Sequence, residues 1–304
     1  MLHNTKVIVV LSSYNGEKYI KRQLDSIFSQ KEVCVTCYVR DDGSTDKTLS
    51  ILESLTKQYP NLIVTKGENI GWKASFMEAL KSSGDADYYA FSDQDDIWFE
   101  DKLKRAINFL ETTDLTRPAL YHSNRLSCNE ELIPLKKQTK RAAQPLSFEN
   151  SLVQEYCQGC TMVFNKAAKD LACKCYSNKL PHDYWIGLIS YLFGTVIYDN
   201  MPTLYHIHHG NNTSSDGNLY EGWIKRLKKY KERAVYIVPA KILLNFQVNG
   251  LTSYQVKILR IFILSKNSVL KRLLLVLNNK IKRINLIGTL SLKTALLLNK
   301  IEIV

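Results

Sequence analysis

Patterns typical of strands and helices alternate along the first 112 residues, and this alternation constrains the fold more than any other feature of the chain. Runs rich in β-branched and aromatic residues predict strands, and each is followed by a segment whose apolar residues recur at helical spacing. Such alternation favours an α/β fold with a doubly wound, mostly parallel sheet. The predicted strands are 6–12, 33–40, 61–65 and 88–91, and the predicted helices are 19–30, 44–59 (with Ser44 as N-cap), 73–81 and 101–110.

The stretch from 113 to 164 is less regular, and the same folded domain is expected to continue to residue 215. A polar, turn-rich segment at 209–218 predicts a loop and a domain edge. We therefore expect one domain over residues 1–215, with halves of about 1–112 and 113–215, and a helical region over 216–304. In the second half, strand patterns occur at 119–122, 160–164 and 196–198, and helical patterns occur at 167–176 and 185–193.

The region 216–304 differs in charge from the rest of the chain. From Glu221 onward there are 17 Lys and Arg against 3 Glu, whereas residues 1–220 carry 24 Lys and Arg against 26 Asp and Glu. Its apolar residues fall on helix faces with cations around them, as in basic amphipathic helices. These faces either pack on the folded domain or attach the chain to an anionic membrane surface, and both can hold. The two apolar stripes are Trp223, Leu227, Tyr230, Ala234 and Ile237, and Leu270, Leu273, Leu274 and Leu277.

No stretch reaches the ~18–20 uncharged apolar residues of a membrane span, and no secretory signal pattern follows the N-terminus. With an odd number of cysteines, seven, these features favour a reduced, cytoplasmic location. The basic amphipathic region adds the expectation of a peripheral position at the inner face of the plasma membrane. Cys34, Cys37, Cys157 and Cys160 have the spacing of a zinc site. We favour buried thiols, because a spacing of three within a strand places Cys34 and Cys37 on opposite faces.

Polar motifs follow three of the predicted strands at the point where each strand ends. In an open α/β sheet, ligands bind at the carboxyl ends of the strands, so these motifs are expected to form one crevice. No G-x-G-x-x-G follows the first strand and no G-x-x-x-x-G-K-[ST] occurs, which argues against dinucleotide-binding and P-loop proteins. The motifs are Ser12-Ser13-Tyr14-Asn15-Gly16, Asp41-Asp42-Gly43-Ser44-Thr45-Asp46 and Ser92-Asp93-Gln94-Asp95-Asp96-Ile97-Trp98.

The segment Asp93-Gln94-Asp95-Asp96 places three carboxylates within four residues. Such crowding is unfavourable without a cation, and Mg²⁺ or Mn²⁺ is commonly held by one or two carboxylates together with substrate phosphates. Asp41 is placed to accept hydrogen bonds from the N–H donors of a nucleobase. The alternative for the acidic segment is a solvated loop that precedes the helix at 101–110.

These motifs, in this order, resemble those of the family 2 glycosyltransferases, which have the GT-A fold. The resemblance includes Ser13-Tyr14-Asn15-Gly16-Glu17, the two acidic motifs and Asn69-Ile70-Gly71, and it covers about residues 5–215. Downstream, Gln158-Gly159-Cys160-Thr161-Met162 is similar to the acceptor-side segment, and His182-Asp183-Tyr184-Trp185 is similar to the segment with the catalytic base. The closing segment Tyr205-His206-Ile207-His208, followed by Gly210-Asn211-Asn212, resembles that of bacterial rhamnosyltransferase-like members.

The resemblance implies inverting transfer of a sugar, with rhamnose suggested by the subgroup, from a nucleoside-diphosphate sugar to a saccharide or lipid-linked saccharide in cell-surface polysaccharide synthesis. It implies that the half 1–112 binds the donor, that the half 113–215 binds the acceptor, that Asp183 is the general base and that Mn²⁺ or Mg²⁺ is the cofactor. The implied donor-binding residues are Ser12, Ser13, Tyr14, Asn15, Glu17, Asp41, Asp42, Gly71, Lys73 and Asp93; the implied metal site is Asp95 with Asp93, Asp96 and His208; the implied acceptor-side residues are Gly159, Cys160, His182 and Trp185.

The chain departs from the closing motif at two positions. His206 stands where an arginine is usual, and an extra His209 precedes the glycine. The roles of the histidines therefore stay open, and His208 is expected either as a metal ligand or as a hydrogen-bonded loop residue. Asp183 also has a second interpretation, as the N-cap of a hydrophobic helix.

Two other classes of protein share some of these features. A sugar-1-phosphate nucleotidyltransferase has a similar doubly wound layout, but it needs a Gly-rich basic loop where this chain has Ser13-Tyr14-Asn15-Gly16-Glu17. A non-enzymatic nucleic-acid-binding protein would use the basic region. Residues 1–220 carry a net charge of −2 and no recognised nucleic-acid motif, so a nucleic-acid partner is not expected. No pattern in the chain specifies an oligomeric state.

Overall fold

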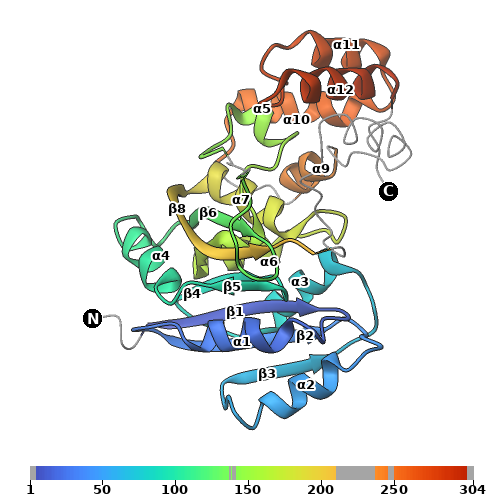
Figure 1. Ribbon diagram of the computed structural model, residues 1–304. Coiled ribbons are helices and arrows are strands. Elements are labelled where there is room, and N and C mark those ends of the chain that lie inside the picture. The colour runs from blue at the N-terminus through green and yellow to red at the C-terminus, as the bar shows by residue number, and fades with distance from the viewer. Residues whose placement is uncertain (1–4, 137, 139–141, 210–236, 246–249, 300–304) are drawn as a thin grey trace. The chain divides into compact units, whose positions relative to one another are not determined.

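The computed structural model describes residues 5–136, 138, 142–209, 237–245 and 250–299 (Figure 1). The chain forms two compact units and passes between them five times. Unit 1 comprises Met1–Ala143, Cys157–Lys174 and Pro181–Asn212, and unit 2 comprises Gln144–Tyr156, Cys175–Leu180 and Thr213–Val304.

Unit 1 is built on an eight-stranded sheet in the order β3-β2-β1-β4-β7-β6-β8-β5. The first four strands along the chain are parallel neighbours, with β1 between β2 and β4 and with β3 beyond β2. The expectation of a doubly wound, mostly parallel sheet is confirmed. The strands are β1 (Lys6–Ser13), β2 (Cys34–Asp41), β3 (Leu62–Lys66), β4 (Tyr88–Ser92), β5 (Asp96–Trp98), β6 (Ala119–Cys128), β7 (Met162–Asn165) and β8 (Thr195–Ile207).

The second half of the sheet adds three antiparallel ladders. Strand β7 pairs antiparallel with both β4 and β6, and β5 pairs antiparallel with β8, whereas β6 and β8 are parallel. The sequence did not predict β5, which has only three residues, and it predicted only the start of β8, which has 13. The pairing of β5 with β8 places Asp96 opposite His206.

The helices of unit 1 bury the apolar faces that the sequence predicts. In α1, the side chains of Ile20, Leu24 and Ile27 are fully buried, and full burial of one such side chain contributes about 1.5–3 kcal/mol. Helix α2 begins at Thr48, so the prediction of Ser44 as its N-cap is wrong. The helices are α1 (Ile20–Phe28), α2 (Thr48–Leu55), α3 (Trp72–Ser82), α4 (Lys102–Leu110), α6 (Lys166–Lys174) and α7 (His182–Phe193).

Unit 2 is helical, and it joins a segment from the middle of the chain to the C-terminal region. The Asn150 amide donates to the Lys282 carbonyl at 2.7 Å, the Gln154 Oε1 accepts from the Ile284 amide at 2.8 Å, and Tyr254 donates to Glu149. These contacts link positions more than 100 residues apart. Its helices are α5 (Phe148–Ser151), α9 (Ile237–Asn245), α10 (Ser253–Ser265), α11 (Val269–Leu277) and α12 (Leu286–Leu297).

Side chains cap three of these helices. Thr252 forms a capping box with Gln255 at the start of α10, Ser268 accepts from an α11 amide, and Asn285 accepts from an α12 amide. Each cap satisfies an amide that has no partner within the helix. The caps help to define where these three helices begin.

The predicted stripe on α11 is exposed. Leu270 is 65% exposed and Leu277 is 78% exposed, whereas Leu275 is the buried residue of this helix. Within unit 2, this stripe is therefore not part of the buried core. Of the other stripe, only Ile237 lies within the described residues. In the described part of the chain, no helix combines the length and the apolar composition needed to cross a bilayer.

Candidate active site

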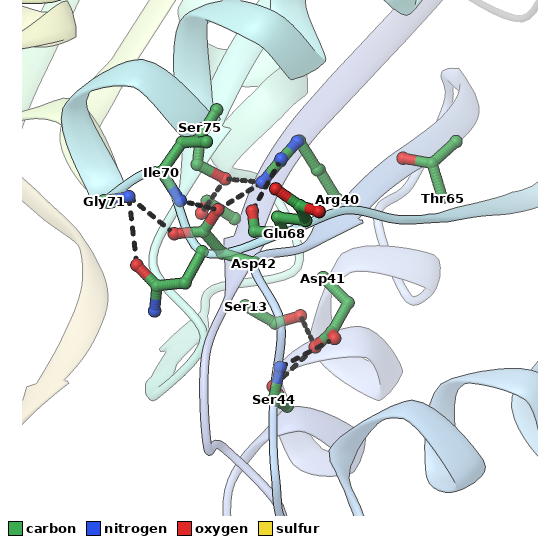
Figure 2. A network of polar contacts seen from close by, with 12 residues as sticks. Ser13, Arg40, Asp41, Asp42, Ser44, Thr65, Glu68, Ile70, Gly71 and Ser75 are labelled. Carbon is green, nitrogen blue, oxygen red and sulfur yellow. Dashed lines mark hydrogen bonds and ion pairs between the residues drawn. The ribbon is translucent and has the colours of Figure 1, made fainter.

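The end of β2 carries two adjacent carboxylates that have different partners (Figure 2). Asp41 is fully buried, and its oxygens accept from the Ser13 hydroxyl at 3.1 Å and from the Ser44 amide and hydroxyl at 3.0 and 2.5 Å. These bonds tie the carboxyl ends of β1 and β2 together. Asp41 thus lies at the edge of the sheet where a nucleotide is predicted to bind, and in this structure it links the loops that follow β1 and β2.

Asp42 organises the loop between β3 and α3. Its Oδ1 accepts from the Ile70 amide at 3.0 Å and its Oδ2 accepts from the Gly71 amide at 2.9 Å, while the Arg40 guanidinium forms an ion pair with it (Figure 2). Gly71 has a φ of +81°, a backbone conformation that favours glycine. The carboxylate therefore fixes the backbone immediately before Lys73, which the sequence assigns to the donor site.

Hydrogen bonds also join the loop after β1 to the loops after β2 and β4. The Asn15 Oδ1 accepts from the Thr45 amide at 2.8 Å, and the Glu17 Oε2 accepts from the Lys47 amide at 3.0 Å. Gln94 forms two bonds with the backbone of Tyr14, accepting from its amide at 2.9 Å and donating to its carbonyl at 3.1 Å. The three motifs predicted to meet at the carboxyl edge of the sheet are thus bonded to one another.

The acidic segment has a buried inner carboxylate and two more accessible ones. Asp96 is buried on β5, and its Oδ1 lies 2.8 Å from the His206 Nδ1, while its Oδ2 is buried with no hydrogen-bond partner among the described residues. The Asp95 Oδ2 lies 2.8 Å from the His209 Nε2. The structure therefore brings His206 and His209 to the carboxylates, and it places the His208 ring against the His206 ring, with centroids 5.1 Å apart.

Electrostatics show the cost of this crowding. Burial and the charges of Asp96 and Asp95 raise the pKa of Asp93 to about 7. Burial and Asp96 also raise the pKa of Asp95, although His209 acts in the opposite direction. Burial disfavours the charge on His206, but its hydrogen bond with Asp96 raises its pKa above the ordinary value. The site thus has more negative charge than its histidines neutralise.

A divalent cation fits this donor set. A hard cation takes oxygen ligands, and its charge would relieve the repulsion that raises the pKa values of Asp93 and Asp95. Among the described residues, Asp96, Cys160 and His206 also have potential ligand atoms within 4.8 Å of one another. Burial holds the pKa of the Cys160 thiol well above its usual range, which makes that sulfur a poor partner for Mg²⁺ or Mn²⁺. The oxygens of Asp93 and Asp95 suit such a cation better.

Asp183 lies in the same site, in the first turn of α7. Its Oδ2 accepts from the Gly159 amide at 3.2 Å and its Oδ1 accepts from the Tyr184 amide at 2.8 Å. Its charge is near enough to raise the pKa of Asp93. The N-cap of α7 is Pro181, so the interpretation of Asp183 as the N-cap is wrong.

His182 is packed in an aromatic cage behind Asp183. Its ring stacks on Phe76 with centroids 4.0 Å apart and meets Phe91 and Trp72 edge-on. Burial lowers its pKa to about 4, so the ring is neutral near pH 7. A Cβ on Gly159 would lie 2.8 Å from the His182 Nε2, which explains the glycine at that position.

Two other predicted acceptor-side residues are also buried. Trp185 is fully buried and donates its indole N–H to the Ala172 carbonyl at 3.3 Å, and Cys160 is buried. These side chains position the backbone of the site in this structure.

Among the predicted donor-site residues, Tyr14 is 46% exposed, and the ammonium of Lys73 lies 5.6 Å from the centroid of the exposed Trp72 ring. The Ser12 hydroxyl donates to Ser75.

A buried lysine underneath the acidic segment is a feature that sequence analysis missed. Lys102 is fully buried in α4, donates to the Cys160 carbonyl and lies 3.6 Å from the centroid of the Trp98 ring. Burial lowers its pKa to about 7, while Cys160, Asp96 and Asp93 act in the opposite direction. In the sequence it reads as one of several helix-surface cations, because its apolar neighbours come from distant segments.

Lys102→Met is expected to change how stability depends on pH. The folded-state pKa lies below the ordinary value of 10.5, so the contribution of Lys102 to the unfolding free energy is fully present above pH 10.5 and lost as pH falls toward 7. The unfolding free energy of wild type minus that of the variant should therefore increase from pH 7 to 10, by up to about 1.4 kcal/mol per pH unit. Urea unfolding at pH 7, 8 and 9 measures it. Lys104→Met on the same helix is the control, and parallel curves for Lys102→Met would contradict the expectation.

The four cysteines considered for a zinc site form no three-ligand cluster among the described residues. Cys34 is exposed and Cys37 is buried, which confirms that they lie on opposite faces of β2, although the expectation that Cys34 is buried is wrong. Cys157 and Cys160 are buried thiols, as expected.

Comparison with known proteins agrees with this geometry. The sequence model of the family described as Glycosyl transferase family 2 matches residues 8–171. The dTDP-rhamnosyl transferase RfbG of Shigella flexneri is 41% identical over 105 residues, which are 33% of this chain and 36% of that protein. An uncharacterized glycosyltransferase of Rickettsia typhi is 24% identical over 273 residues, which are 82% of each chain. This chain thus spans only about a third of the Shigella protein.

A solved structure shows the same fold. S. aureus TarS in complex with UDP-GlcNAc matches with a TM-score of 0.58 at 21% identity, covering 86% of this chain and 72% of that chain. The architecture is therefore the GT-A arrangement that the motifs led us to expect. Since the family match covers more than half of the 304 residues, this chain belongs to the family 2 glycosyltransferases.

Proposed function

We propose that this protein is an inverting glycosyltransferase that moves a sugar, rhamnose in particular, from a nucleoside-diphosphate donor to a saccharide or lipid-linked saccharide acceptor. The observation that carries the proposal is that Asp183 lies beside the acidic segment: its carboxylate accepts from the Gly159 amide, and potential ligand atoms of the adjacent Cys160 and of Asp96 lie within 4.8 Å of each other. Asp93 and Asp95 suit a metal-diphosphate, and Asp183 suits removal of a proton. The relative whose name specifies dTDP-rhamnosyl transfer supports the choice of donor.

The donor would lie across the joined ends of β1, β2 and β4. Asp41, held by Ser13 and Ser44, would accept hydrogen bonds from the nucleobase and orient the loops that receive it. The ribose and diphosphate would meet Asp93 and Asp95. Asp93 and Asp95, with His208 or His209 nearby, would hold Mn²⁺ or Mg²⁺, which when bound would neutralise charge on the leaving nucleoside diphosphate.

The acceptor hydroxyl would attack the anomeric carbon from the face opposite the diphosphate. Asp183 accepts its proton, and the two amides that donate to the Asp183 carboxylate hold it in place. General-base catalysis of this kind contributes about 10²–10⁴-fold. The reaction needs no covalent glycosyl-enzyme, because one displacement inverts the anomeric centre.

A thermal-shift screen of nucleotide sugars tests the donor. We expect dTDP-rhamnose with Mn²⁺ or Mg²⁺ to raise the Tm more than UDP-GlcNAc or GDP-mannose, because a ligand of the folded state at about 100 times its Kd adds about 2.7 kcal/mol. Turnover should then release a nucleoside diphosphate. No shift with any nucleotide sugar, or release of pyrophosphate from a nucleoside triphosphate and a sugar phosphate, would contradict the proposal.

The acceptor proposal includes a location. We propose that the protein works in cell-surface polysaccharide synthesis, peripheral at the inner face of the plasma membrane, with the basic helices of unit 2 toward anionic lipid. The support is the exposed apolar stripe of α11 together with the cations around it. A cation near an anionic membrane contributes ~1 kcal/mol to attachment.

A further inference from the structure

A groove between α10 and α11 is lined entirely by residues of unit 2. It has a volume of about 550 Å³, within the range of about 300–1,000 Å³ that is typical of small-molecule sites. Its lining combines aliphatic and cationic side chains. It is lined by Leu251, Ser253, Val256, Lys257, Arg260, Ile261, Leu264, Lys271 and Leu274.

The charge around this groove has one sign. Residues 250–299 contain nine Lys and Arg and no Asp or Glu. Lys257 and Arg260 are three residues apart on α10, and therefore on one face of that helix, and Lys271 reaches the groove from α11. None of these three cations forms an ion pair with another described residue. A ligand with a phosphate group would neutralise their positive charge.

The aliphatic wall continues into an exposed apolar surface. Leu264 is 53% exposed and Leu274 is 44% exposed, and both line the groove. Beyond them, Leu270, Leu273 and Leu277 on α11 are exposed as well. An exposed apolar surface of this kind marks an interaction site or a membrane contact. A nucleic-acid backbone has no aliphatic part that would cover it, whereas a lipid has both an anionic headgroup and an alkyl chain.

We propose that the α10–α11 groove binds one anionic phospholipid of the membrane surface, with its phosphate among Lys257, Arg260 and Lys271 and its acyl chain against Leu264 and Leu274. The inference rests on the proposed membrane attachment and adds to it a defined lipid site. It does not depend on the donor chemistry of unit 1. The basic helices would then attach to the bilayer by binding one lipid at a defined site, in addition to the general electrostatic attraction between their cations and anionic lipids.

Binding of a water-soluble lipid to the full chain tests the site. Dihexanoyl phosphatidylglycerol, kept below its critical micelle concentration, is titrated by calorimetry. We expect one saturable site, binding of dihexanoyl phosphatidylcholine at least tenfold weaker, and binding of inorganic phosphate weaker still. Since each cation contributes roughly fivefold, Lys257→Gln with Arg260→Gln should weaken binding about 25-fold. The control, Lys282→Gln with Lys293→Gln, removes the same charge outside the groove and should change binding less than about threefold.

A second pair of variants tests the aliphatic wall. Leu274→Gln should weaken binding of the short-chain lipid about tenfold or more, because the acyl chain loses apolar contact. Leu286→Gln on α12, at a side chain 73% exposed and outside the groove, should have little effect. Both changes keep good helix formers, so the melting temperature of each variant checks folding.

Three results would overturn the inference. They are equal losses in the groove pair and the control pair, inorganic phosphate that binds as tightly as the lipid, and an oligonucleotide that displaces the lipid and loses affinity in the same groove variant. The nucleotide-sugar thermal shift is measured on the same samples. Failure at the groove with an unchanged donor shift would remove the lipid site and leave the proposed glycosyl transfer standing.

Discussion

Asp183→Asn is expected to fold and to bind the donor, but to transfer sugar about 10²–10⁴-fold more slowly than wild type. The amide oxygen of asparagine can keep one of the two hydrogen bonds that the carboxylate accepts, from Tyr184 at 2.8 Å or from Gly159 at 3.2 Å. The geometry of the first turn of α7 is thus largely retained while the base is lost. Initial rates with saturating donor, together with the donor-induced Tm shift, measure the two effects separately.

The matched control for this change is Asp170→Asn on α6. Asp170 is an exposed carboxylate that forms an i,i+4 ion pair with Lys166 at 3.0 Å, a kind of pair that contributes little to stability. We expect its rate to stay close to wild type. If Asp183→Asn keeps its rate within about tenfold of the control, Asp183 is not the base.

Asp95→Asn should abolish the dependence of activity on a divalent ion and lower kcat/KM by about 100-fold or more. Asp95 lies between Asp93 and Asp96, and its pKa is raised by burial and by Asp96. Removal of its charge relieves repulsion, so the metal-free variant should be at least as stable as wild type. Titration with Mn²⁺, followed by electron paramagnetic resonance, should then show weaker binding in the variant.

Two further measurements make this prediction specific. Asp101→Asn, which changes an exposed carboxylate just before α4, should leave metal binding and rate unchanged. His209→Ala keeps the Asp95 carboxylate and removes its 2.8 Å partner, so it should weaken the site less than Asp95→Asn does. Wild-type activity that survives exhaustive treatment with EDTA would exclude the metal role of this segment.

The parallel half of the sheet could be predicted from sequence because its determinants are local. The buried residues of the first four strands are mostly apolar, with the buried polar ones near the carboxyl ends, and α1 shows its apolar positions at 20, 24 and 27. The polar motifs follow directly from the strand ends, so their meeting at one edge is a matter of topology. The acidic segment was accordingly predicted from the residues themselves, whereas Asp183 was predicted only from the resemblance to the family.

The antiparallel half could not be predicted in the same way. Strand β5 has three residues and exists because β8 offers it a partner, and β6 shifts register against β8 between Ser123 and Asn124. Neither feature leaves a periodic pattern in the sequence. The direction of each histidine depends on this pairing, which is why the sequence singled out His208 while the structure places His206 and His209 at the carboxylates.

Two polar contacts were missed for a related reason. Gln94 bonds the backbone of Tyr14 across 80 residues of sequence, and Lys102 bonds the Cys160 carbonyl across 58. Glutamine in a loop and lysine in an amphipathic helix are ordinary surface residues by composition. Only the fold shows that Gln94 joins two loops and that Lys102 is buried near the carboxylates of Asp93 and Asp96.

The path of the chain through unit 2 has a consequence for synthesis. Asn150 is bonded to a carbonyl 132 residues further along the chain. At translation rates of about 5–20 residues per second, it emerges roughly 7–26 s before its partner does. The sheet of unit 1 can gather its strands up to β8 during that interval, whereas unit 2 cannot close until the last helices leave the ribosome.

A protein truncated after residue 215 would lack the C-terminal helices, so its unit 2 could not form. The partners of Glu149, Asn150 and Gln154 would be absent, and three polar side chains in the middle of the chain would lose the contacts that the C-terminal helices supply. The basic helices are therefore part of how the middle of the polypeptide reaches its final form. A truncation that removes these helices could therefore reduce membrane binding through a folding defect. Point substitutions on their surface test membrane binding without that complication.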